Sequence, residues 1–467
     1  MLTKDFSQYH DVTSDSKEVV KGGIFVAIKG LKNDGHDCID EALQNGAKLI
    51  IVDKSYKDKV SNLDVTKYLE VDDTRKALRD IASTIYEQPK NIVAVTGTNG
   101  KTSVACFYRQ LIELLGYKSA SIGTLGVMST DGKVSQSMCL TTPPVGQIHK
   151  MLHQLKSHGI ENVILEASSH GLDQDRIGRI KISTAAFTSF SQDHLNYHGS
   201  MENYLKAKLL LFSKVLQDNS IVVINNEMEI ADQVIEVCKA RGHRIYTYGK
   251  AADFLNILSI KYREGKSHVK FLLEGKNYNK SFNFMGDFQI YNILCALCLA
   301  IAKGFDKQRC LSVLNKLQLV PGRMEPVDGS NVFVDFAHTP DGLEKALTVL
   351  HENKAKGRVI VVFGCGGDRD KGKRSKMGSV ANKIADIAIV SDDNPRTEDP
   401  AAIRKEIMAH CPKAIEVGGR EEAIKTAIEM MKPDDLLLIA GKGHEQTQII
   451  GTEHFHFNDI EVARRYL

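Results

Sequence analysis

The middle of the sequence, residues 91–318, repeats one pattern: a short apolar run, then polar or glycine residues, then a helical stretch. This alternation is typical of a parallel sheet whose strands are joined by helices, and it predicts an α/β fold. The alternation returns after residue 319 and predicts a second, doubly wound sheet there. The predicted strands of the two segments are residues 92–95, 163–165, 185–190, 221–224, 332–334, 359–363, 387–390 and 436–440.

The length of the chain, 467 residues, suits about three domains. The first segment mixes helices with short strands, which we predict at residues 23–28 and 48–52. Residues 88–90, Gln-Pro-Lys, are the expected linker to the next segment. We therefore expect three α/β domains, at residues 1–90, 91–318 and 319–467.

The composition, 42% apolar and 25% charged, is that of an ordinary globular protein. A net charge of +3, with basic residues spread along the chain, gives no reason to expect a nucleic-acid partner. The sequence contains no run of about 18 apolar residues that could cross a bilayer, and residues 1–5 begin no apolar signal segment. We therefore expect neither membrane insertion nor export.

The nine cysteines are scattered and odd in number, which fits reduced thiols in a cytoplasmic protein. Cys295 and Cys298 have the spacing of a metal-binding or redox pair. They lie in an apolar run, however, so we predict that they are buried cysteines of a helix.

A glycine-rich segment, residues 96–102 (TGTNGKT), follows the predicted strand 92–95 and precedes a helical stretch. Glycines let backbone N–H groups face an anion at a helix N-terminus, which predicts a phosphate-binding loop. Lys101 would then reach the β- and γ-phosphates, and Thr102 would hold Mg²⁺. Val95 stands where the usual motif has its first glycine. The alternative is a tight strand–helix turn that needs glycine for its shape.

Polar side chains also follow two further predicted strands, and ligands of parallel α/β sheets bind at such strand ends. Glu166 follows strand 163–165, where a carboxylate could complete a magnesium shell; a helix-capping or surface acid is the alternative. His194 follows strand 185–190, where a ligand or catalytic role competes with a structural one. Lys208 lies on an amphipathic helical stretch and would ordinarily be a solvated lysine.

These motifs, taken together and in order, resemble those of the Mur ligases, the ATP-dependent amide-forming enzymes of peptidoglycan synthesis. Within that family the C-terminal blocks GCGGDRD (364–370) and GKGHE (441–445) are similar to those of the members that add the third residue of the stem peptide. The other segments that carry the resemblance are residues 14–16, 22–27, 96–102, 166–172, 193–199, 321–325 and 335–340.

The resemblance implies an N-terminal UDP-binding domain, a central P-loop-type ATPase domain and a C-terminal Rossmann-like domain that closes over the site. The nucleotide would be bound by Gly97, Thr98, Asn99, Gly100, Lys101, Thr102, Ser103, Asn292, Arg323 and Asp335. The UDP-linked acceptor would lie against Ser14, Ser16, Thr141, Thr142, Ser168, Gln174 and Arg176, with residues 31–33 nearby. For Gln174 and Arg176, surface positions on a loop are the alternative.

The resemblance also implies that CO₂ modifies Lys208 to N6-carboxylysine. A carbamate presents oxygens to a hard cation, whereas a lysine ammonium would be repelled by it. The family pattern makes Lys101, Glu166, His194 and Lys208 the catalytic residues, and it places two Mg²⁺ ions against Thr102, Glu166, His194 and Lys208.

The implied reaction begins when the D-glutamate γ-carboxylate of UDP-N-acetylmuramoyl-L-alanyl-D-glutamate attacks the γ-phosphate of ATP. The resulting acyl phosphate is attacked by an amine, phosphate leaves, and an amide remains. Carboxylate and triphosphate repel each other, so Mg²⁺ and Lys101 must offset their charge.

A turn at residues 393–396, Asp-Asn-Pro-Arg, indicates which amine is used. It is similar to the pattern of members that accept meso-diaminopimelate, whereas the lysine users lack its arginine. The Arg396 guanidinium would pair with the distal carboxylate, and Asp393 or Asn394 would receive the distal ammonium. The alternative is a surface arginine in a turn. The implied diaminopimelate pocket consists of Arg369, Asp393, Asn394, Pro395, Arg396, Gly441 and Glu445.

Three other functions compete with this one: the same ligation with L-lysine, a folylpolyglutamate synthase-like activity, and an inactive ATP-binding scaffold. A folylpolyglutamate synthase needs neither the N-terminal UDP domain nor the 393–396 turn. A scaffold would be expected to have lost reactive positions, yet Lys101, Thr102, Glu166, His194 and Lys208 are all present. We expect a monomer.

Overall fold

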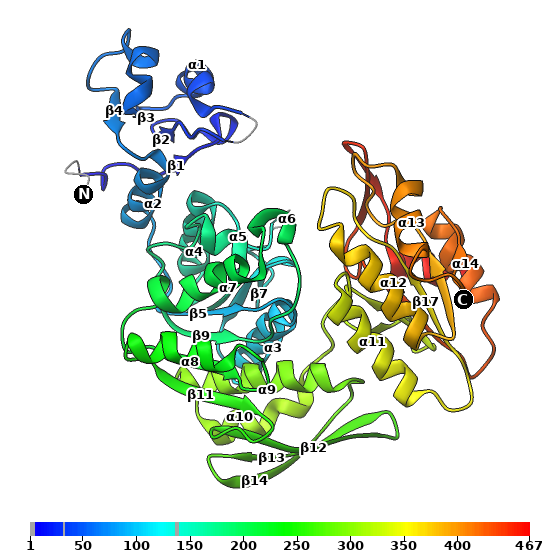
Figure 1. Cartoon of the computed structure of the whole chain (residues 1–467). Helices are drawn as coiled ribbons and strands as arrows, with labels where there is room; N and C mark the ends of the chain where they lie inside the picture. Colours follow the sequence, from blue (N-terminus) through cyan, green and yellow to red (C-terminus); the bar gives the residue numbers. More distant parts are fainter. Residues whose placement is uncertain (1–4, 31–32, 136–139) are drawn as a thin grey trace.

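The computed structural model describes residues 5–30, 33–135 and 140–467, which form sheets of four, ten, six and two strands (Figure 1). The N-terminal sheet is parallel throughout, in the order β1-β2-β3-β4. Its strands and flanking helices are β1 (Val12–Thr13), β2 (Ile24–Val26), α1 (Ile39–Gln44), β3 (Leu49–Asp53), β4 (Tyr68–Val71) and α2 (Thr74–Ile85).

The central sheet has the order β14-β13-β12-β11-β10-β9-β5-β8-β6-β7. Its strands are β5 (Asn91–Thr96), β6 (Ser119–Gly123), β7 (Gly126–Ser129), β8 (Asn162–Glu166), β9 (Ile182–Phe187), β10 (Ile221–Asn225), β11 (Arg244–Gly249), β12 (Leu255–Arg263), β13 (Lys266–Leu273) and β14 (Lys276–Phe282). The seven inner strands, β12, β11, β10, β9, β5, β8 and β6, run parallel, as predicted. At the two edges, β7 pairs antiparallel with β6, and β13 and β14 pair antiparallel next to β12.

One predicted strand is displaced. The strand expected at residues 185–190 is β9, which ends at Phe187. The residues that follow leave the sheet and bond instead to the predicted phosphate-binding loop. The Thr188 hydroxyl donates to the Asn99 carbonyl at 2.6 Å, and Thr98 N donates to the carbonyl of Ser189 at 2.8 Å. The end of β9 therefore helps to shape that loop.

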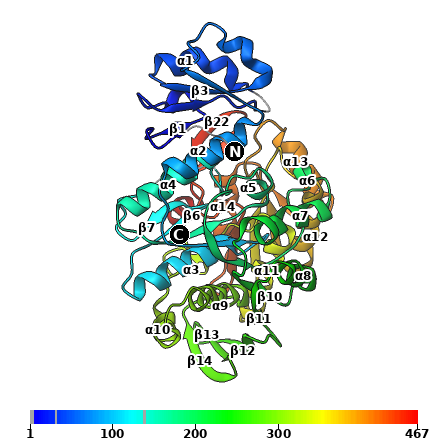
Figure 2. The ribbon, with the colours of Figure 1, turned by 90° about the vertical axis from the view of Figure 1, so that its left-hand side faces the viewer.

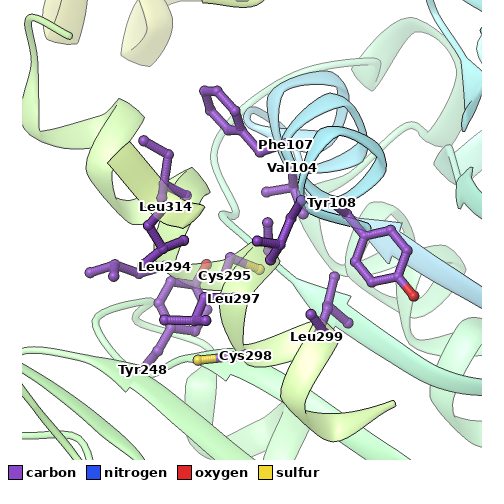
Figure 3. Packing of buried hydrophobic residues seen from close by; sticks show 14 of the residues in the cluster. Val104, Phe107, Tyr108, Tyr248, Leu294, Cys295, Leu297, Cys298, Leu299 and Leu314 are labelled. Carbon is purple, nitrogen blue, oxygen red and sulfur yellow. The ribbon is translucent and has the colours of Figure 1, made fainter. Parts of the chain in front are cut away.

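Helices cover both faces of the central sheet. One face packs on α3 (Lys101–Leu114), α9 (Asp287–Ala302) and α10 (Lys307–Val313). The other packs on α4 (Val145–Ser157), α5 (Ser169–Asp173), α7 (Met201–Leu210) and α8 (Ala231–Ala240). Figure 3 shows Cys295 and Cys298 of α9 among apolar side chains, with Cys298 beside Tyr248 of β11; both thiols are fully buried, as predicted.

The C-terminal sheet has the order β15-β16-β20-β17-β18-β19 and is parallel except for β15. Its elements are β15 (Glu325–Pro326), β16 (Val332–Asp335), α11 (Pro340–Asn353), β17 (Val359–Phe363), α12 (Gly372–Ile384), β18 (Ile387–Val390), α13 (Pro400–Met408), β19 (Ile415–Glu416), α14 (Arg420–Glu429), β20 (Leu436–Ala440) and α15 (Asp459–Tyr466). Helices α11 to α13 cover one face, while α14 and α15 cover the other, so the sheet is doubly wound.

The three sheets belong to separate units. The C-terminal unit lies beside the central one, and the N-terminal unit lies at the end of the central unit opposite β13 and β14 (Figures 1 and 2). A two-stranded hairpin, β21 (Thr447–Ile450) and β22 (Glu453–His456), follows β20 in the C-terminal unit. Within the part of the chain described above, no helix has both the length and the apolar character needed to cross a bilayer.

Candidate active site

The predicted phosphate-binding loop connects β5 to α3. Gly100 caps α3 with a φ of 87°, and a Cβ at this position would lie 2.6 Å from Asn292 Oδ1. Both constraints require glycine. Asn292 of α9, predicted from the family pattern, therefore packs directly on the loop.

Lys101 begins α3 and folds back over the loop that precedes it. Its Nζ donates to the carbonyl oxygens of Gly97 and Thr98, each at 2.9 Å. Burial lowers the pKa of Lys101, although the carboxylates of Glu166 and Asp193 oppose that shift. The loop thus holds its cation next to the N–H groups that would receive an anion.

Glu166 ends β8 and is 2% exposed, so it is neither a surface acid nor a helix cap. Its Oε2 accepts from Thr102 Oγ1 at 3.0 Å and from Thr124 Oγ1 at 3.1 Å, while Oε1 accepts from Thr124 N at 2.9 Å. Burial raises the pKa of Glu166, against the opposing effect of Lys101. Two predicted magnesium ligands, Thr102 and Glu166, therefore lie in direct contact.

Lys208 on α7 is not a solvated lysine, because it is 1% exposed. Its Nζ donates to the carbonyl of Gly97 at 2.7 Å and lies 4.5 Å from the centre of the Tyr204 ring. Burial, reinforced by repulsion from Lys101, holds the pKa of Lys208 well below its ordinary value.

His194 precedes α6 (Leu195–His198) with a φ of 56°, in the left-handed region. Its Nε2 lies 3.2 Å from Asp193 Oδ2, and its ring meets that of His170 edge to face at 4.8 Å. Burial lowers the pKa of His194 to about 3, so the imidazole is neutral at physiological pH and offers a lone pair. Among the described residues, no three His, Cys, Asp or Glu side chains converge closely enough to hold a metal ion.

Arg323 connects this loop to the C-terminal unit, which also contains Asp335. Arg323 Nη2 donates to Thr102 Oγ1 at 3.1 Å, and its guanidinium lies 4.4 Å from the centre of the Phe336 ring. Asp335 ends β16 and accepts from Met324 N at 2.7 Å; burial raises the pKa of Asp335.

The residues predicted to hold the UDP-linked acceptor fall into two places. In the central unit, Thr142 Oγ1 donates to the Glu166 carbonyl at 2.8 Å, and Arg176 Nη1 donates to the Thr142 carbonyl at 2.7 Å. Ser168, Thr141 and Gln174 join the same hydrogen-bonded group, in which Gln174 is exposed and Arg176 half-buried.

In the N-terminal unit, Ser14 is exposed, whereas Ser16 is buried and donates to Glu41. The structure does not bring either serine to the phosphate-binding loop. Residues 31 and 32 of the predicted 31–33 stretch lie outside the described residues. Residues 1–4, on which the prediction about export partly rests, lie outside them as well.

The turn at residues 393–396 lies after β18 and against the hairpin β21–β22. Arg396 has a φ of 51°, and its Nη1 donates to the Gly367 carbonyl at 2.9 Å. Burial and the charge of Arg369 lower the pKa of Arg396. Arg396 is thus not a simple surface arginine but a half-buried cation.

A cavity of about 2140 Å³ between the central and C-terminal units joins the two sets of residues. The predicted residues that line it are Thr98, Asn99, Gly100, Lys101, Thr102, Ser103, Thr141, His194, Asn292, Arg323, Asp335, Arg369, Asp393, Asn394, Arg396, Gly441 and Glu445. The predicted residues outside its lining are Gly97, Glu166, Lys208, Thr142, Ser168, Gln174, Arg176, Ser14, Ser16 and Pro395.

Several polar residues of the site were not singled out from the sequence. Asp193 is 5% exposed and lies between His194 and His338, whose Nε2 is 3.8 Å from Asp193 Oδ2. Asp341 accepts from Asn99 Nδ2 at 2.8 Å across the two units. Asp193 could have been suspected because it directly precedes His194, but the pairing of Asp341 with Asn99 has no local signal.

Three family models match the chain: the Mur ligase catalytic domain at residues 8–86, the Mur ligase middle domain at 95–300, and the Mur ligase glutamate ligase domain at 322–443. The chain is 44% identical to a UDP-N-acetylmuramoyl-L-alanyl-D-glutamate--2,6-diaminopimelate ligase of Rickettsia montanensis, over 99% of this chain and 97% of that one.

Two solved structures extend the comparison. A UDP-N-acetylmuramoyl-L-alanyl-D-glutamate--2,6-diaminopimelate ligase is 32% identical with a TM-score of 0.67, over 98% of this chain and 94% of that one. The MurF ligase from Thermotoga maritima, in complex with ADP, shares the fold at 21% identity with a TM-score of 0.70, over 99% and 98% of the two chains. The chain therefore belongs to the Mur ligases, the ATP-dependent amide-forming family that its motifs resemble.

Proposed function

We propose that this chain joins meso-2,6-diaminopimelate to the D-glutamate γ-carboxylate of UDP-N-acetylmuramoyl-L-alanyl-D-glutamate, with ATP converted to ADP and phosphate. The observation that carries the proposal is one cavity lined by the phosphate-binding loop on one unit and by Arg396 on the other. Such a cavity allows an activated carboxylate and an amine with a distal carboxylate to meet. The names of the 44% and 32% identical relatives support the same substrates.

The chemistry proceeds in two displacements. A γ-carboxylate oxygen forms a bond to the γ-phosphorus of ATP, and the bond to the ADP oxygen breaks. The amine nitrogen then attacks the acyl carbon, phosphate leaves with the bonding electrons, and the nitrogen loses a proton. Lys101 and Arg323 would offset the triphosphate charge that otherwise repels the incoming carboxylate.

The site suits magnesium in part without modification. Thr102 and Glu166 present oxygens 3.0 Å apart, and hard cations prefer such ligands together with substrate phosphates. We propose that these two residues hold one Mg²⁺ and that His194, Glu166 and Lys208 serve a second. Bound Mg²⁺ would supply charge stabilisation for the transferring phosphoryl group.

Lys208 fits the second ion only after modification, because an ammonium cannot ligate a cation. Its lowered pKa favours the neutral amine, which is the form that can attack the carbon of CO₂. In that step an N–C bond forms, one C–O π pair moves onto oxygen, and a proton leaves the nitrogen. We therefore propose that Lys208 is carbamylated.

The remaining assignments follow the same proposal. The UDP end would lie against Ser14 and Ser16 of the N-terminal unit, and the dipeptide against Thr141, Thr142, Ser168, Gln174 and Arg176. We propose domain boundaries near residues 90 and 318. The first boundary lies between β4 and β5, and the second lies between β14 and β15. We also propose a monomer that works in the cytoplasm.

The proposed function is tested by measuring phosphate release from ATP in the presence of the UDP-linked dipeptide. Addition of meso-diaminopimelate should start continuous release of phosphate, and mass spectrometry should find the UDP-linked tripeptide. No release of phosphate under any condition would support an inactive ATP-binding scaffold instead, and release that requires a folate would support a folylpolyglutamate synthase-like activity.

A further inference from the structure

A buried lysine, Lys442, lies against the 393–396 turn, and no function has been given to it above. Lys442 follows β20 and Gly441, and it is 0% exposed. Its Nζ donates three hydrogen bonds: to Asn394 Oδ1 at 3.0 Å, to Glu445 Oε2 at 2.8 Å and to the carbonyl of Thr447 at 2.7 Å. An ammonium has three protons, so Lys442 is saturated and has none left for a substrate.

The three acceptors come from three different segments: the 393–396 turn, the GKGHE loop and strand β21. Lys442 therefore joins the parts of the chain that converge on the amino-acid end of the cavity. The backbone connects them as well, since Arg396 N donates to the Ile449 carbonyl at 3.1 Å and Gly451 N donates to the Arg396 carbonyl at 2.7 Å. The position of Arg396 thus depends on the same junction.

The Asn394 Oδ1 has both of its acceptor positions occupied in this arrangement. Its Oδ1 accepts from Lys442 and from Ile449 N, and its Nδ2 donates to Glu445 Oε2 at 2.9 Å. Asn394 is therefore poorly suited to receive a substrate ammonium directly. Glu445 lines the cavity with its side chain 33% exposed, so it keeps accessible oxygen for an incoming cation.

Asp393 lies in the same group of charges. Burial alone would raise the pKa of Asp393, but the charges of Lys442 and Arg420 hold that pKa below its ordinary value. Arg420 is itself engaged by Asp459 through two bonds of 2.8 Å. Lys442 is thus the cation that Asp393, Asn394 and Glu445 share.

We propose that Lys442 is a positioning residue that sets the amino-acid selectivity of the pocket, because it holds Glu445 and the 393–396 turn in a fixed position relative to each other. This inference rests on the proposed function and adds a specificity determinant to it. Without Lys442, a vacated ammonium position would remain between Asn394 and Glu445. The substrate's own distal ammonium could occupy that position, which would draw its carboxylate away from Arg396 and remove the advantage of diaminopimelate over L-lysine.

The test compares steady-state constants of Lys442→Met, Lys442→Gln and the wild type, with Lys413→Met as a matched control at an exposed position of the same unit. Loss of a buried charged partner predicts that Lys442→Met raises the KM for diaminopimelate by about tenfold or more. The KM values for ATP and for the UDP-linked dipeptide should stay within about threefold, because Lys442 contacts neither site. The preference for diaminopimelate over L-lysine should fall by about tenfold or more.

A double variant, Lys442→Met with Glu445→Gln, gives an independent readout. If Lys442 acts through Glu445, the double variant should be no worse for diaminopimelate than Glu445→Gln alone. Additive effects, an unchanged preference over L-lysine, or a parallel rise of all three KM values would overturn the proposal. Should Lys442→Met fail to fold, the Lys442→Gln variant decides by the same preference ratio.

Failure of the proposed function gives a different result. In that case the wild type itself would release no phosphate in response to diaminopimelate, whatever residue 442 is.

Discussion

Lys208 and Lys101 donate to one carbonyl oxygen, that of Gly97, at 2.7 and 2.9 Å. Burial disfavours the charged form of Lys208, and repulsion from the nearby Lys101 ammonium adds to that effect. The result is a pKa for Lys208 well below its ordinary value. A lysine that looks like part of a solvated helix face in the sequence is therefore buried, and its charged form is disfavoured.

Lys208→Ala should lower kcat by about 10³-fold, because the proposed carbamate oxygens and the charge stabilisation that they would supply are lost together. Formate or acetate should restore part of the activity by entering the vacated space. The matched control is Lys206→Ala, which removes an exposed lysine of the same helix and should leave kcat unchanged. Full activity of Lys208→Ala would exclude the carbamate role.

The start of α3 depends on Gly100. Its φ of 87° and the 2.6 Å approach of Asn292 Oδ1 to a Cβ are separate constraints. Gly304, after α9, provides a comparison, because its φ is 98° and nothing lies within 4 Å of a Cβ there. An alanine would therefore have a strained backbone at either position, but it would meet a steric clash only at position 100.

Gly100→Ala should therefore lose about 1–2 kcal/mol from the left-handed backbone and further stability from the contact with Asn292, and it should raise the KM for ATP by about tenfold or more. Gly304→Ala should show only the backbone cost, with an unchanged KM for ATP. Thermal unfolding and ATP titration of both variants make the comparison. Equal KM values for ATP in the two variants would contradict a tight loop built on Asn292.

Sequence patterns were most informative where one element acts alone. The apolar runs around residues 92–95, 359–363 and 436–440 are buried on both faces, so they read clearly as strands. Strands β12 to β14 escaped prediction because one face of them is exposed, and their polar residues, such as those of residues 276–282, resemble a loop.

The site divides in the same way. Motifs followed by a helix, such as residues 96–102, could be recognised from local chemistry. Contacts between distant segments could not: Lys442 with Asn394 and Asp341 with Asn99 join residues 48 and 242 positions apart. Such pairs depend on how whole units pack, which short sequence motifs do not encode.

The reaction depends on two units of the molecule that meet across one cavity. Arg323 bonds Thr102 of the central unit while it packs on Phe336 of the C-terminal unit. Gln192 Nε2 adds a bond of 3.1 Å to Asp370 Oδ2 across the same boundary. These contacts keep the 393–396 turn and the phosphate-binding loop on the walls of one cavity, so the choice of amine depends on how the two units are assembled.

A competition experiment measures that choice of amine. The wild type and Arg396→Lys are each given ATP, the UDP-linked dipeptide and equal concentrations of meso-diaminopimelate and L-lysine, and the two tripeptide products are counted by mass spectrometry. An unpaired Arg396 should disfavour lysine, so the wild type should form the diaminopimelate product in excess by about 10⁴-fold, and Arg396→Lys should lose most of that excess. Comparable amounts of both products from the wild type, or an excess that Arg396→Lys leaves intact, would show that Arg396 does not select diaminopimelate.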